Sequence, residues 1–317
     1  MKKISSLLIF SFSVLLFAFP SCTAINKYDI DSNKITVVAS LFPQYDFVRQ
    51  IAKDKVNILL LLPAGSEVHT FDPSPADIAQ ISSADIFVYT NEEMEPWADK
   101  IIKSVKSDTL NVVKAGEGAM LESEHEEHEE HEHDHDHEHS YDPHVWLNLE
   151  NSCVMVDNIA AALVSADAPN KSFYLENAEE YKQELLTLDK SIETAVSLGN
   201  KGALVFGGRF AYSYFLCKYN LQYISAYDSC SEQAEPSLKK MTEIISFVKE
   251  NNISVIYYEE LSNPKVARII AEETGAQCLL FSTAHNVTRQ EFSDGITFVG
   301  IMKNNLENIK KGLEINA

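Results

Sequence analysis

Short hydrophobic runs alternate with amphipathic stretches in the first third of the chain. The runs contain many β-branched residues and are bounded by turn residues, which is typical of buried strands. They predict strands at 35–40, 56–62, 85–89 and 110–113. The amphipathic stretches predict helices at 45–52, from Pro75 onward, and at 97–105. Strands that alternate with helices indicate a mainly parallel sheet covered on both faces.

A longer helical pattern extends from Asp167 to Leu198. Its apolar residues recur at steps of three and four, at Ala178, Tyr181, Leu185, Leu188, Ile192 and Ala195. About thirty residues at 1.5 Å each give a helix of roughly 45 Å, which is longer than one small lobe requires. We therefore expect this helix to contact two lobes and to connect them rigidly.

The second half of the chain repeats the alternation. Strands are predicted at 203–206, 255–258 and 278–281, and helices at 210–219, 236–250, 264–274 and 300–313. The predicted fold class is therefore α/β, with two Rossmann-like lobes of mainly parallel sheet joined by one long rigid helix. The predicted segments are a linker at 23–34, a first lobe at 35–166, the joining helix at 167–198 and a second lobe at 199–317.

The first 22 residues have the pattern of a secretion signal. Lys2 and Lys3 precede an apolar run, and Cys22 follows a short cleavage zone. A cysteine at this position indicates a bacterial lipoprotein with Cys22 lipidated, while simple secretion is the alternative. We expect an extracytoplasmic protein, either a cell-membrane lipoprotein or a periplasmic one.

A tract at 124–139 separates the first lobe's strands from the next helix. It holds no apolar residue, so it cannot bury surface, and we expect a surface loop. Carboxylates alternate with seven of the ten histidines of the chain: His125, His128, His131, His133, His135, His137 and His139. A solvated charge run is the simpler interpretation, but alternating imidazoles and carboxylates favour an accessory metal-binding tract.

Charge and cysteine content narrow the function classes. The formal net charge is −21, and nine carboxylates with no Lys or Arg in the tract leave −12 for the remainder. An acidic surface argues against nucleic acid and favours cationic ligands. Cys153, Cys217, Cys230 and Cys278 match no zinc knuckle or disulfide framework, so buried thiols are expected, with a disulfide as the alternative.

The three histidines outside the tract all lie in predicted loops. His69 follows the second strand, His144 follows the tract, and His285 follows a late strand of the second half. Loops converge at the carboxyl ends of parallel strands, so we expect these three imidazoles to meet at one metal between the lobes. A loop histidine is more often a solvated residue. Here, however, two of the three lie in segments bounded by proline.

Three nitrogens and one carboxylate oxygen make a typical tetrahedral zinc shell. Glu259 and Glu260 follow the strand at 255–258 and face opposite ways. We prefer Glu260 as the fourth ligand, because Glu259 continues a strand that should be buried on both faces.

Several segments together resemble the zinc- and manganese-binding proteins of bacterial ABC importers. These are Leu62-Pro-Ala-Gly-Ser-Glu-Val-His-Thr-Phe-Asp-Pro-Ser-Pro, Ala84-Asp-Ile-Phe-Val-Tyr, Asp142-Pro-His-Val-Trp-Leu, Tyr174-Leu-Glu-Asn-Ala, Ala234-Glu-Pro-Ser and Ala271-Glu-Glu-Thr-Gly-Ala. The resemblance covers nearly the whole mature chain. It implies two α/β lobes joined by a rigid helix, a metal in the cleft, and delivery to a membrane permease. His69 and His144 match the family's first two histidine ligands, and the acidic His-rich tract resembles the zinc branch.

The chain departs from this family at the third ligand. Arg209 stands where the family usually has histidine, and the usual acidic fourth ligand near 281–283 is absent. A guanidinium stays protonated and has no lone pair to donate. We therefore expect His285 to replace the third histidine, Glu260 to complete the shell, and Arg209 to pair with a ligating carboxylate.

The leading hypothesis is a monomeric, non-enzymatic binding protein that captures Zn²⁺, with Mn²⁺ as an alternative, for an ABC permease. The first alternative is a surface metal buffer or adhesin. The second is a secreted zinc hydrolase, which is disfavoured because no His-Glu-x-x-His or nucleophile motif accompanies the histidines.

Overall fold

The computed structural model describes residues 30–105, 107, 109–122, 141–200, 202–230 and 234–315. The predicted signal segment, Cys22 and the His-rich tract at 124–139 lie outside this part of the chain. Residues Asp31–Ala317 cluster as one compact unit. The two lobes belong to this unit.

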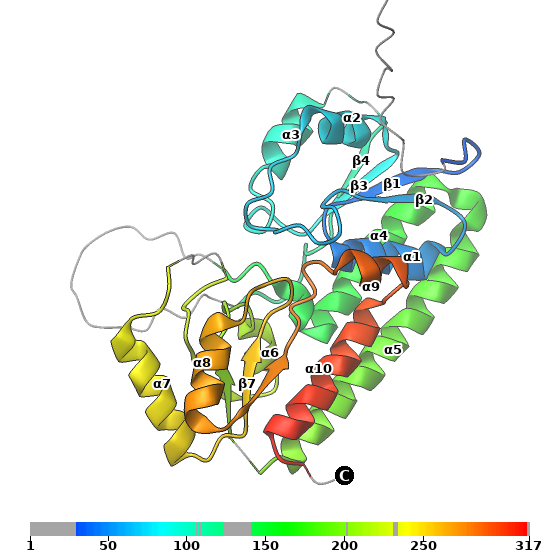
Figure 1. The fold of residues 1–317 in the computed structure, drawn as a ribbon. Helices are drawn as coiled ribbons and strands as arrows, with labels where there is room; N and C mark the ends of the chain where they lie inside the picture. Colours follow the sequence, from blue (N-terminus) through cyan, green and yellow to red (C-terminus); the bar gives the residue numbers. More distant parts are fainter. Residues whose placement is uncertain are drawn as a thin grey trace, which may run out of the picture. The chain divides into compact units, whose positions relative to one another are not determined.

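The first lobe contains a four-stranded sheet. Its strands are β1 (Thr36–Ala39), β2 (Asn57–Leu60), β3 (Ile86–Tyr89) and β4 (Asn111–Lys114), in the order β2-β1-β3-β4. All neighbours pair in parallel, which confirms the parallel sheet predicted from the alternation (Figure 1). The loops that follow the strands therefore gather at one edge of the sheet.

Four helices accompany this sheet. They are α1 (Phe42–Ala52), α2 (Pro75–Ser83), α3 (Ala98–Ser104) and α4 (Leu149–Ala166), with a 3-10 turn, η1 (Val145–Leu147), before α4. Helix α2 begins at Pro75 because Ser74 and Asp77 form a capping box there. Helix α1 begins earlier than predicted, since Pro43 lies in its first turn and Phe42 is already buried.

The second lobe repeats this topology. Its strands are β5 (Ala203–Phe206), β6 (Gln222–Ser225), β7 (Val255–Tyr258) and β8 (Gln277–Leu280), in the parallel order β6-β5-β7-β8. Strand β6 was not predicted, because it lies at the sheet edge and only Ser225 is buried. The accompanying helices are α6 (Ser213–Lys218), α7 (Leu238–Glu250), α8 (Lys265–Thr274), α9 (Arg289–Ser293) and α10 (Phe298–Gly312).

Helix α5 (Lys171–Leu198) joins the lobes. It begins after a separate 3-10 turn, η2 (Ala168–Asn170), rather than at Asp167. Every apolar residue of the predicted stripe is buried, together with Tyr174. The helix packs against α1 and α4 of the first lobe and against the C-terminal α10, which runs beside it in Figure 1. The expectation of one helix in contact with both lobes is therefore confirmed.

One hydrophobic core extends through both lobes. Its buried members include Val37 of β1, Leu185 of α5, Phe206 of β5 and Ile309 of α10. A smaller cluster packs α7 and α8 against the other face of the second sheet. Within the residues described above, none of the helices combines the length and the apolar character that a membrane crossing requires.

Candidate metal centre

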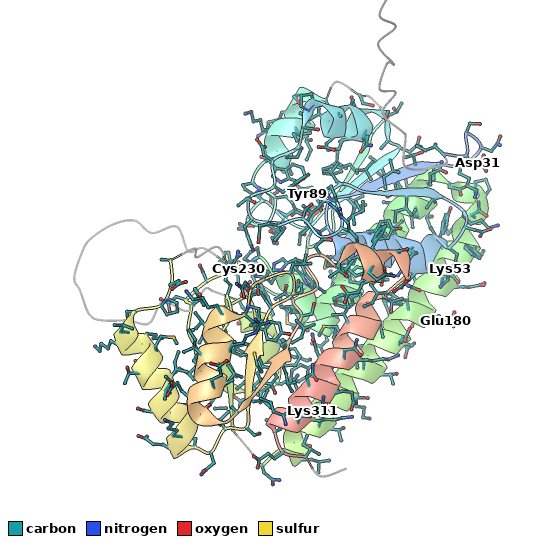
Figure 2. All side chains as sticks on the ribbon, viewed as in Figure 1. Asp31, Lys53, Tyr89, Glu180, Cys230 and Lys311 are labelled. Carbon is teal, nitrogen blue, oxygen red and sulfur yellow. The ribbon has the colours of Figure 1, made fainter. Side chains whose placement is uncertain are left out.

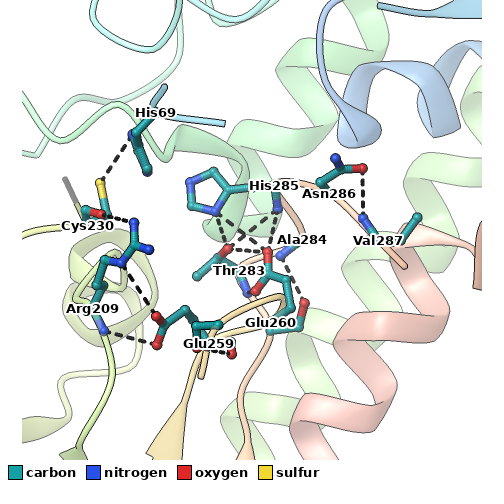
Figure 3. Close-up of polar contacts among 12 residues, drawn as sticks. His69, Arg209, Cys230, Glu259, Glu260, Thr283, Ala284, His285, Asn286 and Val287 are labelled. Atoms are coloured by element: carbon teal, nitrogen blue, oxygen red, sulfur yellow. Dashed lines mark hydrogen bonds and ion pairs between the residues drawn. The ribbon is translucent and has the colours of Figure 1, made fainter. Parts of the chain in front are cut away.

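His69, His144 and His285 meet between the two sheets. One ring nitrogen from each lies within 4.8 Å of the others. The ring centroids of His144 and His285 are 4.5 Å apart, and those of His69 lie 5.3 Å from His285 and 6.1 Å from His144. The structure thus brings together the three histidines that the sequence placed in separate loops, and Figure 3 shows two of them with their surroundings.

His144 is held by a carboxylate two residues earlier in the chain. Asp142 Oδ1 accepts hydrogen bonds from the His144 backbone N–H at 2.9 Å and from ring Nδ1 at 2.5 Å. Both residues are buried. A carboxylate on Nδ1 orients the ring, so Nε2 faces the other histidines and offers its lone pair once the ring is neutral.

His285 belongs to a loop that both lobes hold in place. The His285 backbone carbonyl accepts from Phe42 N–H, and Val287 O accepts from Gly65 N–H at 2.8 Å. Ala284, just before it, has a positive φ of 59°, an uncommon conformation for a residue with a side chain. These bonds tie the loop after β8 to the first lobe and fix where the imidazole lies.

Two ring nitrogens in this cluster lack a hydrogen-bond partner among the described residues. Nε2 of His144 and Nε2 of His285 are both buried, and neither makes a hydrogen bond. A buried polar atom without a partner typically costs about 1–3 kcal/mol. Two such atoms from facing rings indicate a bond to a ligand that both share, and imidazole nitrogen is a good ligand for zinc.

Burial acts on the pKa of all three imidazoles. It lowers the pKa of His69 to about 3, assisted by the nearby His285 and His144. It also lowers the pKa of His285, again assisted by His144. For His144, burial is opposed by the neighbouring Cys230 and Asp142, which together raise the pKa to about 10. At neutral pH the first two rings are free to bind a metal, whereas His144 first has to lose a proton.

Glu260 contacts His285 and Thr283, two residues before it, and lines the same pocket. Its carboxylate accepts from the Thr283 backbone N–H at 2.7 Å, the Thr283 hydroxyl at 2.6 Å and the His285 backbone N–H at 3.0 Å. The nearest approach to His285 Nδ1 is 3.6 Å. These contacts orient the loop of His285, and they engage both oxygens of the carboxylate that the sequence suggested as the fourth ligand.

Arg209 lines the pocket beside the histidines. Its backbone N–H donates to Glu259 Oε2 at 3.0 Å, and its guanidinium pairs with Glu67 Oε2 of the first lobe at 3.2 Å. Gly208 precedes it with no room for a side chain, because a Cβ there would lie 1.8 Å from Glu259 Oε2. Arg209 therefore pairs with carboxylates, but these are Glu67 and Glu259 rather than Glu260.

Cys230 lies next to the histidines, and the sequence analysis did not single it out. Its Sγ is 4.0 Å from His69 Nδ1, as drawn in Figure 3. Figure 2 labels it on the part of the second lobe that faces the first. Prediction of strand β6 would have identified it. Cys230 lies a few residues after this parallel strand, and loops that follow parallel strands gather at the sheet edge where His285 lies.

The pocket at this site is small. Its volume is about 40 Å³, and its lining includes His69, Arg209, Cys230 and His285. A pocket of this size holds an ion with a few waters, whereas sites for organic molecules are typically hundreds of Å³. The geometry favours an ion as the ligand.

The known proteins that this chain resembles include zinc-uptake and zinc-binding proteins, which agrees with a metal site at the three histidines. The sequence model of the family described as "Zinc-uptake complex component A periplasmic" (ZnuA) matches residues 37–312. The high-affinity zinc uptake system protein ZnuA of Bacillus subtilis is 35% identical over 319 residues, covering 100% of this chain and 99% of that protein. The zinc-binding lipoprotein AdcA of Streptococcus pneumoniae is 33% identical over 98% of this chain, which spans 61% of AdcA.

Among solved structures, the Zn(II)-bound ZnuA-like domain of Streptococcus pneumoniae AdcA superimposes with a TM-score of 0.74. It is 28% identical and covers 89% of this chain and 99% of that domain. This likeness confirms the fold of two α/β lobes joined by a long helix.

Proposed function

Because the chain belongs to the ZnuA family, whose sequence model spans residues 37–312, we propose that it is an extracytoplasmic zinc receptor. It captures Zn²⁺ and delivers it to the membrane permease of an ABC importer. The observation that carries this proposal is the meeting of three histidines from separate loops, two of them with buried, unpartnered Nε2 atoms. No catalytic turnover is expected, since a pocket of about 40 Å³ leaves little room for an organic substrate beside the ion.

His69, His144 and His285 act as ligands of the captured ion. Donor atoms that span at most 4.8 Å move inward by distances on the order of 1 Å to reach zinc bonds of about 2.0–2.1 Å. Asp142 orients His144, while Thr283 and Glu260 orient His285. Imidazole nitrogen is a borderline ligand, so this set favours zinc over the harder Mn²⁺.

The lobes are held in a fixed relation while the ion enters and leaves. Helix α5 packs against α1, α4 and α10, and Asp46 Oδ2 of the first lobe accepts from the Phe298 N–H of the second at 2.7 Å. A shared core and such bonds oppose wide hinge opening. Binding and release therefore involve local movement of the loops that contain the histidines, chiefly the half-buried His69.

Two features of the proposal concern residues outside the described part of the chain, and a third concerns the oligomeric state. Lipidation of Cys22 anchors the protein to the membrane, next to the permease. The tract at 124–139 collects zinc at weak, exchangeable sites. The protein acts as a monomer, because both lobes of one chain supply the site. Support for the tract comes from its alternating imidazoles and carboxylates.

Metal analysis with competition titration tests the function. We expect one tight zinc equivalent in the intact protein, which remains after deletion of 124–139. His69→Ala, His144→Ala and His285→Ala should each lose tight binding, whereas His139→Ala in the tract should keep it. Loss of the tight equivalent with the tract, or its persistence in all three single variants, would contradict the proposal.

A further inference from the structure

Cys230 lies where a fourth ligand of the proposed zinc site belongs. We propose that its thiolate completes a shell of three histidines and one cysteine, with Glu260 as a positioning residue for His285. The inference rests on the proposed function, because it concerns the same ion. It replaces the carboxylate ligand that the sequence suggested with a sulfur ligand.

The distance from Cys230 to the histidines fits zinc coordination. With zinc bonds of about 2.3 Å to sulfur and about 2.0–2.1 Å to nitrogen, tetrahedral geometry puts the two ligand atoms roughly 3.6 Å apart. Cys230 Sγ lies 4.0 Å from His69 Nδ1. A shift of a few tenths of an ångström would therefore bring the sulfur to bonding distance.

A second observation points to a shared ligand at the same place. His144 Nε2 and His285 Nε2 are buried and belong to rings 4.5 Å apart, and no residue in the described part of the chain forms a hydrogen bond with either atom. Both rings also lie close to His69, whose Nδ1 faces the sulfur. The four side chains thus surround one small volume.

The backbone around Cys230 is held by residues that follow β5. Arg209 Nη1 donates to the Cys230 carbonyl at 3.4 Å, and Phe210 N–H donates to the Ser229 carbonyl at 3.3 Å. Arg209 is itself held by Glu259 and Glu67. Arg209, which replaces the histidine expected from the family resemblance, therefore holds the loop of Cys230. This contact gives the replacement a structural role.

Glu260 competes poorly for the same position. Oε1 accepts from the Thr283 hydroxyl and the His285 N–H, and Oε2 accepts from the Thr283 N–H. Turning this carboxylate toward the ion would break bonds that hold His285 in place. Its contacts suit orientation of a ligand rather than ligation.

A thiolate changes which ions the site prefers. Sulfur is a soft ligand that selects zinc and still softer ions, whereas Mn²⁺ prefers oxygen. We expect discrimination between Zn²⁺ and Mn²⁺ to fall in Cys230→Ser. Its zinc affinity should drop by more than the roughly 10–100-fold typical of losing an outer partner of a ligand.

Cobalt substitution of the full-length protein, with its thiols reduced and counted, tests the inference. Co²⁺ bound by a thiolate gives an intense near-ultraviolet charge-transfer band, and tetrahedral Co²⁺ gives visible d–d bands whatever its ligands. We expect both in the native protein. Cys230→Ser should lose the charge-transfer band and keep the d–d bands, whereas Cys153→Ser, Cys217→Ser and Glu260→Gln should keep both.

The outcomes separate this inference from the proposed function. A native protein with tetrahedral d–d bands and no charge-transfer band would overturn the cysteine ligand and leave the zinc receptor intact. The same holds if Cys230→Ser keeps the band. Absence of tight Co²⁺ or Zn²⁺ binding in the folded native protein would overturn both. The native spectrum decides even if Cys230→Ser fails to fold, which circular dichroism would show.

Discussion

Replacing Asp142 with Asn should weaken zinc binding without removing a proposed ligand. Asp142 is buried, and its Oδ1 accepts from both the backbone and Nδ1 of His144. Asn keeps the size but loses the negative charge that stabilises the ring in its metal-binding orientation. Loss of such an outer partner typically costs 10–100-fold in metal affinity, or about 1.4–2.7 kcal/mol.

Competition with a chromophoric chelator measures this loss. Asp99→Asn is the matched control, because Asp99 is exposed on α3 and pairs only weakly with Lys103 across one helical turn. We expect unchanged affinity in the control and a 10–100-fold loss in Asp142→Asn. Native affinity in a folded Asp142→Asn protein would refute the argument that Asp142 prepares His144 for zinc.

Three further predictions concern packing, pH and the tract. Trp146→Phe should reduce the free energy of unfolding by roughly 2 kcal/mol, because the fully buried indole loses its 2.8 Å hydrogen bond to the Thr283 carbonyl and leaves a cavity. Urea denaturation measures this loss. A change within about 0.5 kcal/mol, the usual range for surface substitutions, would contradict the prediction. The zinc association constant should fall at least about tenfold for each pH unit as pH falls from about 9 to about 7. The reason is that the pKa of His144 is raised to about 10, so zinc must displace a proton from this ring. Zinc titration at several pH values measures the slope, and an affinity independent of pH would contradict the prediction. Deletion of 124–139 should remove weak zinc sites and keep the tight one in equilibrium dialysis, and an unchanged total stoichiometry would show that the tract binds no zinc.

The helices and strands with regular apolar patterns were predictable, because the spacing of apolar residues along the chain indicates which positions are buried. The stripe of α5 repeats at helical steps over many turns. Strands β1 and β3 are short, mostly apolar runs with β-branched or aromatic residues, which favour buried strands. Strand β6 and helix α9 were missed. Strand β6 is an edge strand with one buried residue, and α9 has five residues and none buried, so neither has a clear apolar pattern.

The candidate site was predictable only in part. With seven histidines in the tract, the remaining three stood out, and strand-end loops placed them near one another. The partners that hold them depend on loop conformation, which sequence patterns do not specify. Asp142 and Thr283 lie two residues before the histidines they contact, yet only the turns of those loops bring the side chains together. Arg209 contacts Glu67 and Cys230, which belong to other loops, and only the folded loops bring these residues together.

Anomalous X-ray diffraction at the zinc absorption edge, on crystals of the zinc-loaded protein, tests the central claim most directly. That claim is that three imidazoles distant in sequence hold one ion. We expect a single strong peak within bonding distance of a ring nitrogen of His69, Nε2 of His144 and Nε2 of His285. A strong peak elsewhere in the ordered chain, or a zinc bound by only one of these rings, would contradict it.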